Sequence, residues 1–340
     1  MYTTSLEDKI FNSPASRISD TLVVISGYIG SETVSMLRNY PDKNFVVVYG
    51  MYACDGISKV LHDNLLDIQE NLNKEKDNWV HIKYSLVPVH SKIYCWSKDG
   101  VITEVLVGSA NFSINGLRKD LKETLYPISS LGYKEYEEYK EFVLKHSIDC
   151  SVATKFKNTP TAEFANDQPY VAQRICRISL LDSKGKVPKQ SGLNWGESKA
   201  HVKKGDAYLP IKVNYIKTFP ELFPQKKYVD GNVNKNSKGK ITRANDEVEF
   251  IWDDKHSMIG LLEGNNNIEG VVYPNKLCSS SSKKELGDYI RKRIEAKLGT
   301  AAYKAEDIIP ITKEILEQYG RTHIDVSRIG DGIYYLDFSV

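Results

Sequence analysis

Cysteine is scarce in this sequence, and the few cysteines present are not arranged for cross-linking. The 340 residues include five, an odd number, and none of them forms a CxxC pair. A disulfide framework and a structural zinc site are therefore not indicated, and a reducing cytoplasm is the expected location. We expect neither a bound metal ion nor another cofactor.

Long apolar runs are also lacking. No stretch approaches the roughly 20 apolar residues that span a bilayer, and MYTTSLEDKIF at the N-terminus lacks the basic and apolar segments of a signal peptide. No P-loop is present, and GYIG at 27–30 lacks the third glycine of a dinucleotide fingerprint. These absences predict a protein that acts away from membranes and does not hydrolyse ATP itself.

Charge is nearly balanced over the whole chain, at +2, but it is unevenly distributed. Residues 1–150 hold 16 Lys and Arg against 20 Asp and Glu, a net −4, and residues 151–340 hold 30 against 24, a net +6. Within 184–243 the count is 14 against 4, a net +10. Such a region suits a polyanion, although a solvated surface is the plainer explanation.

The apolar patterns change character along the chain. In residues 1–150, buried strands such as 21–29 and 44–52 alternate with helical patterns such as 57–72, which predicts an α/β domain with a mainly parallel sheet and some hairpin character. Residues 151–170 are polar and without periodicity, and predict a linker.

Beyond the expected linker, residues 171–340 alternate short apolar runs with loops rich in Gly, Asn, Ser and Lys. This pattern is typical of a barrel or sandwich. Two segments, 283–298 and one near 312–319, have helical patterns. We therefore expect a mostly-β second domain with two short helices.

The chemically most informative stretch runs from residue 86 to residue 113. It predicts a hairpin with the strands LVPVHSKIYCW and ITEVLVG. His90 and Lys92 lie two residues apart and so share a face of the first strand. The second strand ends in a Gly-Ser-Ala-Asn turn, which presents the Ser109 hydroxyl and the Asn111 amide. Together, these groups can hold a phosphodiester and attack it.

The pattern HxK is weak evidence by itself, because it starts at three histidines, His81, His90 and His201. A lone histidine in a strand is usually a packing residue. Only His90 is followed by a glycine-serine-x-asparagine turn at hairpin distance, and this favours a catalytic role for it. We interpret the other two as structural or surface residues.

HSK followed by GSANFS resembles the HKD motif of the phospholipase D superfamily, whose members cleave or transfer phosphodiesters through a phosphohistidine without a metal. The resemblance implies that His90 is the nucleophile and that Lys92 and Asn111 bind the nonbridging oxygens. Ser109 would assist at the phosphate. With one copy of the motif, the second histidine would be His90 of a partner subunit, which implies a homodimer.

The sequence departs from the superfamily pattern in two places. The aspartate expected seven residues after the histidine is Ser97, and the interval from His90 to the glycine, 18 residues, is longer than usual. Superfamily nucleases without this aspartate have a glutamate about a dozen residues past the asparagine. By that resemblance Glu123 would orient the His90 ring and stabilise its charged form.

The whole layout resembles the NgoFVII/NgoAVII-type restriction endonucleases. The similarity includes GLNWG…AYLPI, LGDYIRKRI and YYLDFS in the second half of the chain. Members have a phospholipase-D-like domain and a B3-like pseudobarrel whose two arms enter the DNA major groove. The resemblance implies candidates for DNA contact, which are Asn194, Trp195, Lys199, Lys203, Tyr289, Arg291 and Arg293.

Three functions therefore compete. The first is a type II-like restriction endonuclease that cuts double-stranded DNA at or near a specific sequence. The second is a nonspecific phospholipase-D-family nuclease or phosphodiesterase, and the third is a catalytically degenerate DNA-binding protein. The first would need a companion methyltransferase, and some relatives work with a separate helicase-like ATPase subunit.

Overall fold

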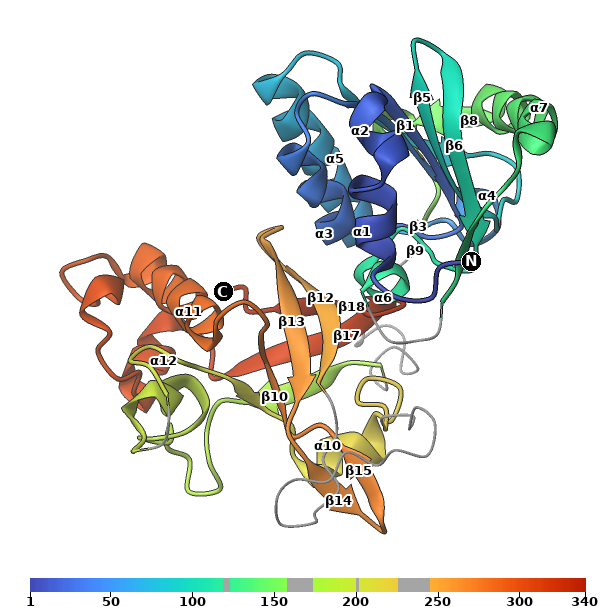
Figure 1. Cartoon of the computed structure of the whole chain (residues 1–340). Coiled ribbons are helices and arrows are strands. Elements are labelled where there is room, and N and C mark those ends of the chain that lie inside the picture. The colour runs from blue at the N-terminus through green and yellow to red at the C-terminus, as the bar shows by residue number, and fades with distance from the viewer. Residues whose placement is uncertain (119–122, 158–173, 200–201, 226–244) are drawn as a thin grey trace. The chain divides into compact units, whose positions relative to one another are not determined.

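The computed structural model describes residues 1–118, 123–157, 174–199, 202–225 and 245–340. The chain forms two compact units, Met1–Thr159 and Pro160–Val340 (Figure 1). Most of the linker expected at 151–170 lies outside the described residues.

A seven-stranded sheet forms the centre of the first unit. Its strand order is β7-β6-β5-β1-β2-β4-β8. The strands are β1 (Thr21–Ser26), β2 (Asn44–Tyr49), β4 (Val80–Ser85), β5 (Lys92–Lys98), β6 (Val101–Gly108), β7 (Leu125–Pro127) and β8 (Ser147–Asp149). A separate short pair joins β3 (Ile57–Ser58) to β9 (Phe156–Lys157).

Helices cover both faces of this sheet. They are α1 (Leu6–Phe11), α2 (Pro14–Ile18), α3 (Ser31–Ser35), α4 (Tyr52–Asp55), α5 (Lys59–Glu75), α6 (Ile114–Leu117) and α7 (Tyr133–Lys145), with 3-10 turns η1 (Met36–Asn39), η2 (Ser130–Gly132) and η3 (Cys150–Val152). Figure 1 shows α7 on the opposite side of the sheet from α3 and α5. Strand β1 is buried at every residue after Thr21, as expected for a strand covered on both faces.

The sheet differs from the expected one in its pairing. Strands β1–β2 and β2–β4 pair in parallel, but β1–β5, β5–β6, β6–β7 and β4–β8 are antiparallel. The prediction of a mainly parallel sheet was therefore wrong. The reason is the hairpin β5–β6, which contributes two strands without a helical crossover between them.

The first strand of that hairpin also begins later than predicted. It starts at Lys92, so that residues 86–91, including His90, lie outside any strand. Pro88 falls in the expected strand and has no backbone N–H to donate to a neighbouring strand. The interruption leaves the His90 side chain exposed while Lys92 is buried.

A second seven-stranded sheet, in the order β10-β17-β18-β12-β13-β16-β11, organises the second unit. Its strands are β10 (Cys176–Ser179), β11 (Leu209–Pro210), β12 (Asp246–Trp252), β13 (Ser257–Glu263), β16 (Lys276–Ser279), β17 (His323–Gly330) and β18 (Ile333–Asp337). A small hairpin, β14 (Asn266–Ile268) with β15 (Val271–Tyr273), lies between β13 and β16 in sequence.

The two predicted helices of the second unit are present as α11 (Lys283–Leu298) and α12 (Lys313–Tyr319). Helix α10 (Val213–Thr218) and the 3-10 turns η4 (Gly192–Glu197) and η5 (Ala305–Asp307) were not expected. Helix α11 has the bounds expected from its sequence pattern, and it packs into the core through Leu286, Ile290 and Ile294, which are fully buried. Their spacing of four residues defines one face of the helix.

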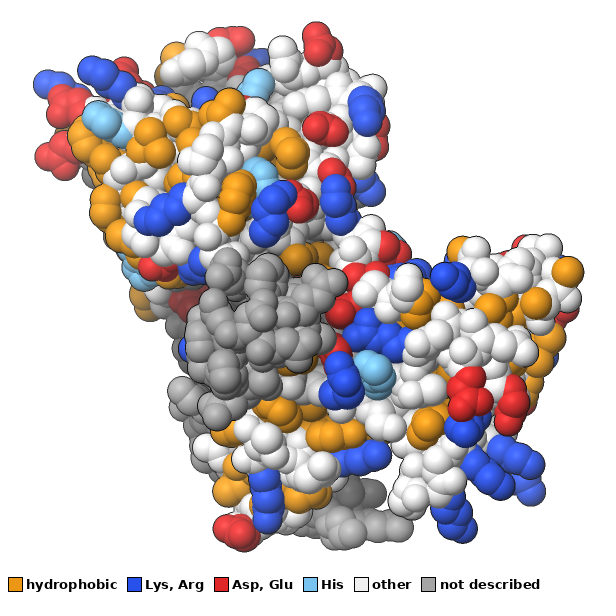
Figure 2. Space-filling view, turned by 180° about the vertical axis from the view of Figure 1, so that it is seen from behind, with side chains coloured by type: hydrophobic (Ala, Val, Ile, Leu, Met, Phe, Trp, Pro, Cys, Tyr) orange, Lys and Arg blue, Asp and Glu red, His pale blue; other side chains and the backbone are white. Residues whose placement is uncertain are grey.

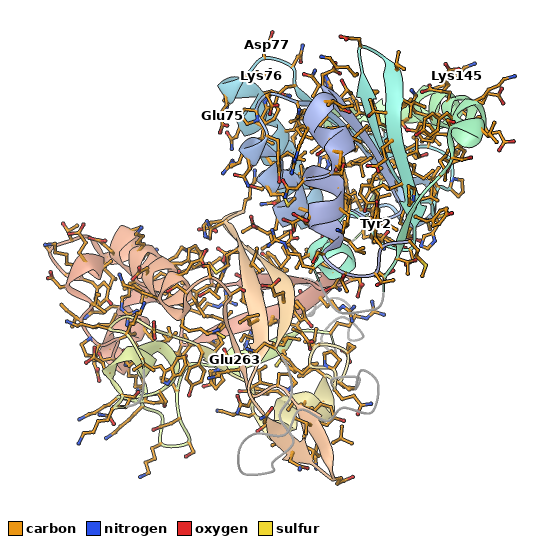
Figure 3. The ribbon with its side chains drawn as sticks, in the orientation of Figure 1. Tyr2, Glu75, Lys76, Asp77, Lys145 and Glu263 are labelled. Atoms are coloured by element: carbon orange, nitrogen blue, oxygen red, sulfur yellow. The ribbon has the colours of Figure 1, made fainter. Side chains whose placement is uncertain are left out.

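None of the helices in the described residues is both long and apolar enough to cross a membrane. Side chains of the described residues are drawn in Figure 3, where Glu263 marks the end of β13.

Candidate active site

The side chains of His90 and Lys92 meet at the end of β1. Ser26, the last residue of β1, pairs with Lys92, the first residue of β5. The Lys92 ammonium lies 3.2 Å from each ring nitrogen of His90 and donates to the His90 carbonyl oxygen at 2.6 Å. An exposed imidazole thus stands against a cation that is only 7% exposed.

The glycine-serine-x-asparagine turn lies beside this pair. The Asn111 Oδ1 accepts from the Tyr28 backbone N–H at 3.3 Å and lies 3.3 Å from the Ser26 hydroxyl, whose single hydrogen is shared with the nearer Tyr28 carbonyl at 2.6 Å. The Ser26 hydroxyl also accepts from the Phe112 N–H at 3.0 Å. Because its oxygen is occupied in this way, the Asn111 amide directs its N–H donors elsewhere, as binding a phosphate oxygen requires.

Ser109 places Glu123 near the same site. The Ser109 N–H donates to the Thr124 carbonyl, and the Ser109 hydroxyl accepts from the Thr124 N–H, both at 3.0 Å. Glu123 is the residue before Thr124. Burial lowers the pKa of the Lys92 ammonium, and the nearby Glu123 carboxylate raises it again. The structure thus brings Glu123 within electrostatic reach of Lys92, although no hydrogen bond joins Glu123 to His90.

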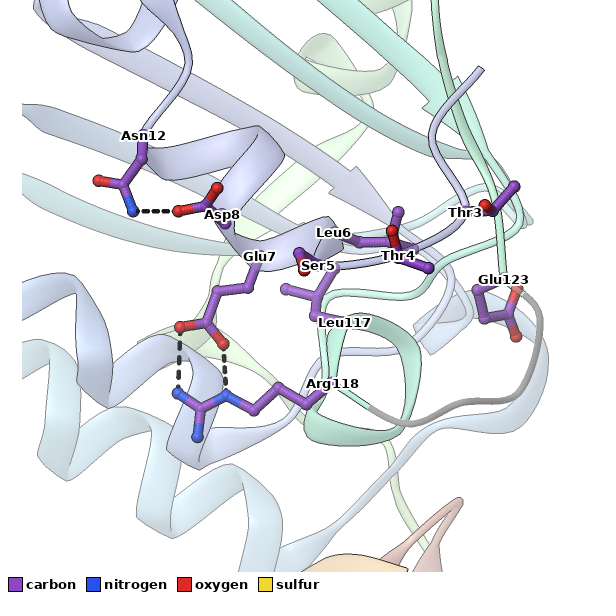
Figure 4. A pocket seen from close by; sticks show the side chains of 10 residues that line it. All are labelled: Thr3, Thr4, Ser5, Leu6, Glu7, Asp8, Asn12, Leu117, Arg118 and Glu123. Atoms are coloured by element: carbon purple, nitrogen blue, oxygen red, sulfur yellow. Dashed lines mark hydrogen bonds and ion pairs between the residues drawn. The ribbon is translucent and has the colours of Figure 1, made fainter.

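Glu123 also lines a pocket of about 490 Å³. Figure 4 shows that the wall is formed by the N-terminal segment and the end of α6, with an ion pair between Glu7 and Arg118. The N-terminal segment is fixed there because Tyr2, labelled in Figure 3, exchanges two backbone hydrogen bonds with Leu125. The Glu123 carboxylate thus lines this pocket and also acts electrostatically on Lys92.

Four glycines allow the backbone to approach closely around this site. A Cβ at Gly27 would lie 2.9 Å from the His90 ring, one at Gly50 would lie 2.1 Å from the Val89 carbonyl, and one at Gly108 would lie 1.9 Å from the Thr124 carbonyl. At Gly116 a Cβ would lie 2.1 Å from the Asn111 carbonyl and 2.6 Å from its nitrogen. At Gly50, Gly108 and Gly116 the close atoms belong to the backbone, which would have to move, whereas at Gly27 the close atom belongs to the His90 ring.

Replacing Gly116 by alanine should therefore displace Asn111. We expect the rate of phosphodiester cleavage to fall by at least about 10-fold, with a loss of roughly 1–3 kcal/mol in the free energy of unfolding from overpacking. Gly132→Ala is the matched control, since its nearest neighbour is the flexible Ile128 methyl at 3.4 Å. Equal activity of the two variants would show that the contact does not position Asn111.

Sequence reasoning missed the segment Ser26–Gly30. The sequence predicts it as the end of a buried strand at 21–29 and excludes it as a dinucleotide motif, but the strand ends at Ser26. The following residues lie against the glycine-serine-x-asparagine turn, where Gly30 N–H donates to the Phe112 carbonyl at 2.9 Å. A usable signal was present, because the segment follows the carboxyl end of a buried strand. Binding residues gather at that edge of α/β sheets.

The residues expected to contact DNA fall into two groups. Asn194 and Arg291 are 2% and 1% exposed. Asn194 donates to the Pro188 and Ile311 carbonyls and accepts from the Ile311 N–H, and Arg291 donates to the Gly205 and Leu193 carbonyls. Both side chains are thus buried and hydrogen-bonded within the fold in this structure, which argues against a DNA contact by either, and their contact with DNA stays a prediction.

Tyr289 and Arg293 are also engaged within the fold. Arg293 donates to both oxygens of Asp253 at 3.1 and 2.6 Å, and to the Tyr289 hydroxyl at 2.8 Å. Tyr289 in turn donates to Asp254 at 2.8 Å. This network ties α11 to the turn between β12 and β13, and it leaves neither side chain free to bind DNA without breaking charged hydrogen bonds.

The remaining candidates lie on accessible surface. Lys199 and Lys203 are exposed. Trp195 is partly buried, and the Lys276 ammonium lies 4.2 Å from its ring centre, a cation–π contact. Lys and Arg side chains are dispersed over the face drawn in Figure 2, among neutral and acidic ones.

Comparison with known proteins identifies both units. Residues 4–154 match the family model of the NgoFVII restriction endonuclease N-terminal PLD domain. Residues 170–330 match the model of the NgoFVII C-terminal B3-like DNA-binding domain. These matches confirm the expected phospholipase-D-like fold of the first unit and the B3-like pseudobarrel of the second. A search of curated proteins found no match to this sequence.

Several solved structures are similar over part of the chain. NucT from Helicobacter pylori has 15% identity and a TM-score of 0.31 over 42% of this chain and 92% of its own. Polyphosphate kinase from Porphyromonas gingivalis has 17% identity and a TM-score of 0.29 over 50% of this chain. Phosphatidylserine synthase from Haemophilus influenzae Rd KW20 has 11% identity and a TM-score of 0.30 over 40%.

The chain spans about a quarter of the length of that kinase, 26%, and 35% of the synthase. The two family matches, by contrast, lie on the two units that the structure separates and cover nearly the whole sequence. The chain belongs to the NgoFVII restriction endonuclease family, and it combines the phospholipase-D-like domain of that family with its B3-like DNA-binding domain.

Proposed function

We propose that this protein is a type II-like restriction endonuclease that hydrolyses double-stranded DNA at or near a specific sequence, without a metal ion, through a phosphohistidine on His90. The observation that carries the proposal is the meeting of an exposed imidazole, a buried ammonium and an amide whose oxygen is already occupied. Such groups suit an attack on a phosphodiester.

His90 would attack phosphorus in line and form a phosphoamidate, while the 3′ or 5′ oxygen leaves with a proton from a second imidazole. That imidazole, then neutral, would take a proton from water, and the resulting hydroxide would attack phosphorus and release His90. Lys92 and the Asn111 amide would hold the charge on the nonbridging oxygens. Glu123 would support the charged forms of His90 and Lys92.

The second imidazole would be His90 of a partner subunit, since the family resemblance gives one motif copy per chain. The active site would then be shared by a homodimer formed through the nuclease domain. Heterodimers containing one His90→Ala subunit should accordingly be as inactive as the variant homodimer. Half the wild-type activity in such heterodimers would contradict a shared site.

The charge of Glu123 supplies a prediction about pH. Its carboxylate raises the pKa of Lys92, against the effect of burial. Glu123→Gln removes this negative charge, so the Lys92 pKa should fall and the ammonium should deprotonate at a lower pH. The alkaline limb of the single-turnover rate should therefore move to lower pH in the variant, measured between about pH 7 and 10, below the ordinary lysine pKa. If the alkaline limb stays at the wild-type pH, even at a lower maximal rate, Glu123 does not influence the pKa of Lys92.

The basic loop at residues 198–206 is the part of the second unit that we propose for phosphate contact. Lys199, Lys203 and Lys204 are exposed in it, and the Arg291 guanidinium holds its Gly205 carbonyl from inside. The Lys276 ammonium lies over the ring of Trp195, which comes shortly before this loop in the sequence. The described part of the loop thus combines exposed lysines with a backbone that is anchored at Gly205.

Replacing Lys199, Lys203 and Lys204 together by alanine should weaken DNA binding and flatten its salt dependence. Each lost phosphate contact reduces the slope of log K against log salt by about 0.9, so the slope should change by up to about 3. The matched control replaces Lys74, Lys134 and Lys145, which are exposed in the first unit. If both triple variants keep the wild-type slope, the loop faces solvent in the complex.

A plasmid digest in EDTA tests the function itself. Discrete bands with a common sequence at or near their ends are the expected result, and sequencing those ends gives the recognition sequence and the cleavage position. A smear would indicate a nonspecific nuclease, and specific binding without cleavage would indicate a degenerate enzyme. Repeating the digest with magnesium and ATP and a helicase-like subunit tests that partner, and methylated plasmid tests the companion methyltransferase.

A further inference from the structure

The side chain of Tyr28 stands beside the His90 imidazole. The two rings meet edge to face, with centroids 6.0 Å apart and planes at 80°. The backbone of the same residue holds the other side of the site, because its N–H donates to the Asn111 oxygen and its carbonyl accepts from the Ser26 hydroxyl at 2.6 Å. One residue thus touches both the candidate nucleophile and the candidate phosphate-binding amide.

The Tyr28 ring is itself fixed from two directions. Its hydroxyl donates to the Asp55 carboxylate at the end of α4 over 2.7 Å, and its ring packs edge to face on Tyr49, which is buried, at 5.9 Å. The hydrogen bond to Asp55 raises the pKa of the Tyr28 hydroxyl to about 12, so that it stays protonated at neutral pH. The hydroxyl therefore acts as a donor to Asp55, not as a base toward the substrate.

The His90 imidazole, which lies outside any strand, thus has the Tyr28 ring on one side and the Lys92 ammonium at its ring nitrogens. Gly27 adds no atom there, since a Cβ would lie 2.9 Å from the His90 ring. At the far end, Lys157 in β9 lies 4.0 Å from the Asp55 carboxylate. Both of these charged side chains are more than one third exposed, so this outer contact is weak.

We propose that Tyr28 is a positioning residue for His90 and that Asp55 fixes it through the hydroxyl. The inference rests on the proposed function, in which His90 attacks phosphorus in line. An imidazole that turns away from the line of attack loses rate and not substrate affinity. The Tyr28–Asp55 pair should therefore affect kcat and leave KM unchanged.

The test compares four variants in the full-length protein with plasmid DNA as substrate. Tyr28→Phe and Asp55→Leu each remove the hydrogen bond, and each should lower kcat by about 5-fold, the order expected for one lost orienting contact. Asp55→Asn keeps an acceptor and should restore most of the rate. The double variant Tyr28→Phe/Asp55→Leu should be no slower than either single one, because both remove the same contact.

Tyr303→Phe is the matched control, since it deletes a hydroxyl that donates to a backbone carbonyl in the second unit. A second readout does not depend on cleavage: the imidazole ¹H–¹³C signal of His90, identified by its loss in His90→Ala, should move in Tyr28→Phe and further in Tyr28→Leu. If that signal moves while the wild type does not cut DNA, the proposed function fails and the positioning role stands. A wild-type kcat in Tyr28→Phe, or additive losses in the double variant, or an unmoved His90 signal, would overturn the proposal.

Discussion

Replacing His90 by alanine should abolish cleavage while leaving DNA binding intact. Without the imidazole no covalent bond to phosphorus can form, and the partner subunit loses its acid and base as well. We expect the cleavage rate to fall by at least about 10³-fold, equivalent to roughly 4 kcal/mol of barrier. Binding should persist because it depends on the second unit, which matches a DNA-binding domain.

The measurement is a single-turnover cleavage assay with a parallel binding titration on the same DNA. His81→Ala is the matched control, since His81 also begins an HxK sequence and is partly buried in β4, in the same unit. The control should cut at close to the wild-type rate. Wild-type cutting by His90→Ala would remove this residue from its proposed role, and loss of binding would point to a folding defect.

Replacing Arg291 by alanine should unfold the second unit at a lower temperature. The guanidinium is 1% exposed and donates to the Gly205 and Leu193 carbonyls. Its removal leaves two carbonyls without these donors and a cavity beneath α11. Losses of this kind cost roughly 3 kcal/mol in the free energy of unfolding, or about 6–12 °C in Tm for a unit of this size.

Lys292→Ala is the matched control, because Lys292 is the next residue of α11 and is exposed. Its effect on stability should be within about 0.5 kcal/mol. Differential scanning calorimetry of both variants gives the comparison. If Arg291→Ala lost affinity for DNA at unchanged Tm, Arg291 would be a contact residue after all, and its buried position would not describe the complex.

The candidate catalytic residues could be picked out from the sequence because the chemistry proposed for them depends on local spacing. His90 and Lys92 are two residues apart, and Ser109 and Asn111 share one turn, so neighbouring positions already bring most of the groups together. The structure shows these residues converging, even though the strand begins at Lys92 and not before His90. Because His90 and Lys92 are only two residues apart, their side chains still meet although the strand does not extend back to Pro88.

Which residues contact DNA is harder to predict from sequence, because only an exposed side chain can reach DNA. Whether a side chain is exposed depends on parts of the chain that are far away in the sequence. Arg291 and Arg293 lie in a run that reads as basic, LGDYIRKRI, but the helix turns one arginine into the core and the other toward Asp253. Asn194 looks like a base-reading side chain and instead bonds the Ile311 backbone, 117 residues along the chain. Only the folded contacts distinguish these roles.

Tyr28 illustrates the same limit at the active site. Its hydroxyl reaches Asp55 and its N–H reaches Asn111, residues separated from it by 27 and 83 positions. No motif links the three. By contrast, the helices at 283–298 and near 312–319 followed directly from apolar periodicity, and α11 has the bounds that its periodicity predicts.

The stereochemical course at phosphorus tests the central claim most directly. DNA carrying one phosphorothioate of defined configuration at the scissile position would be cleaved in isotopically labelled water, in EDTA. Attack by His90 followed by attack by water involves two in-line displacements, so the configuration should be retained. Inversion, which a single attack by water produces, would contradict the account, and so would a requirement for a divalent cation at the scissile phosphate.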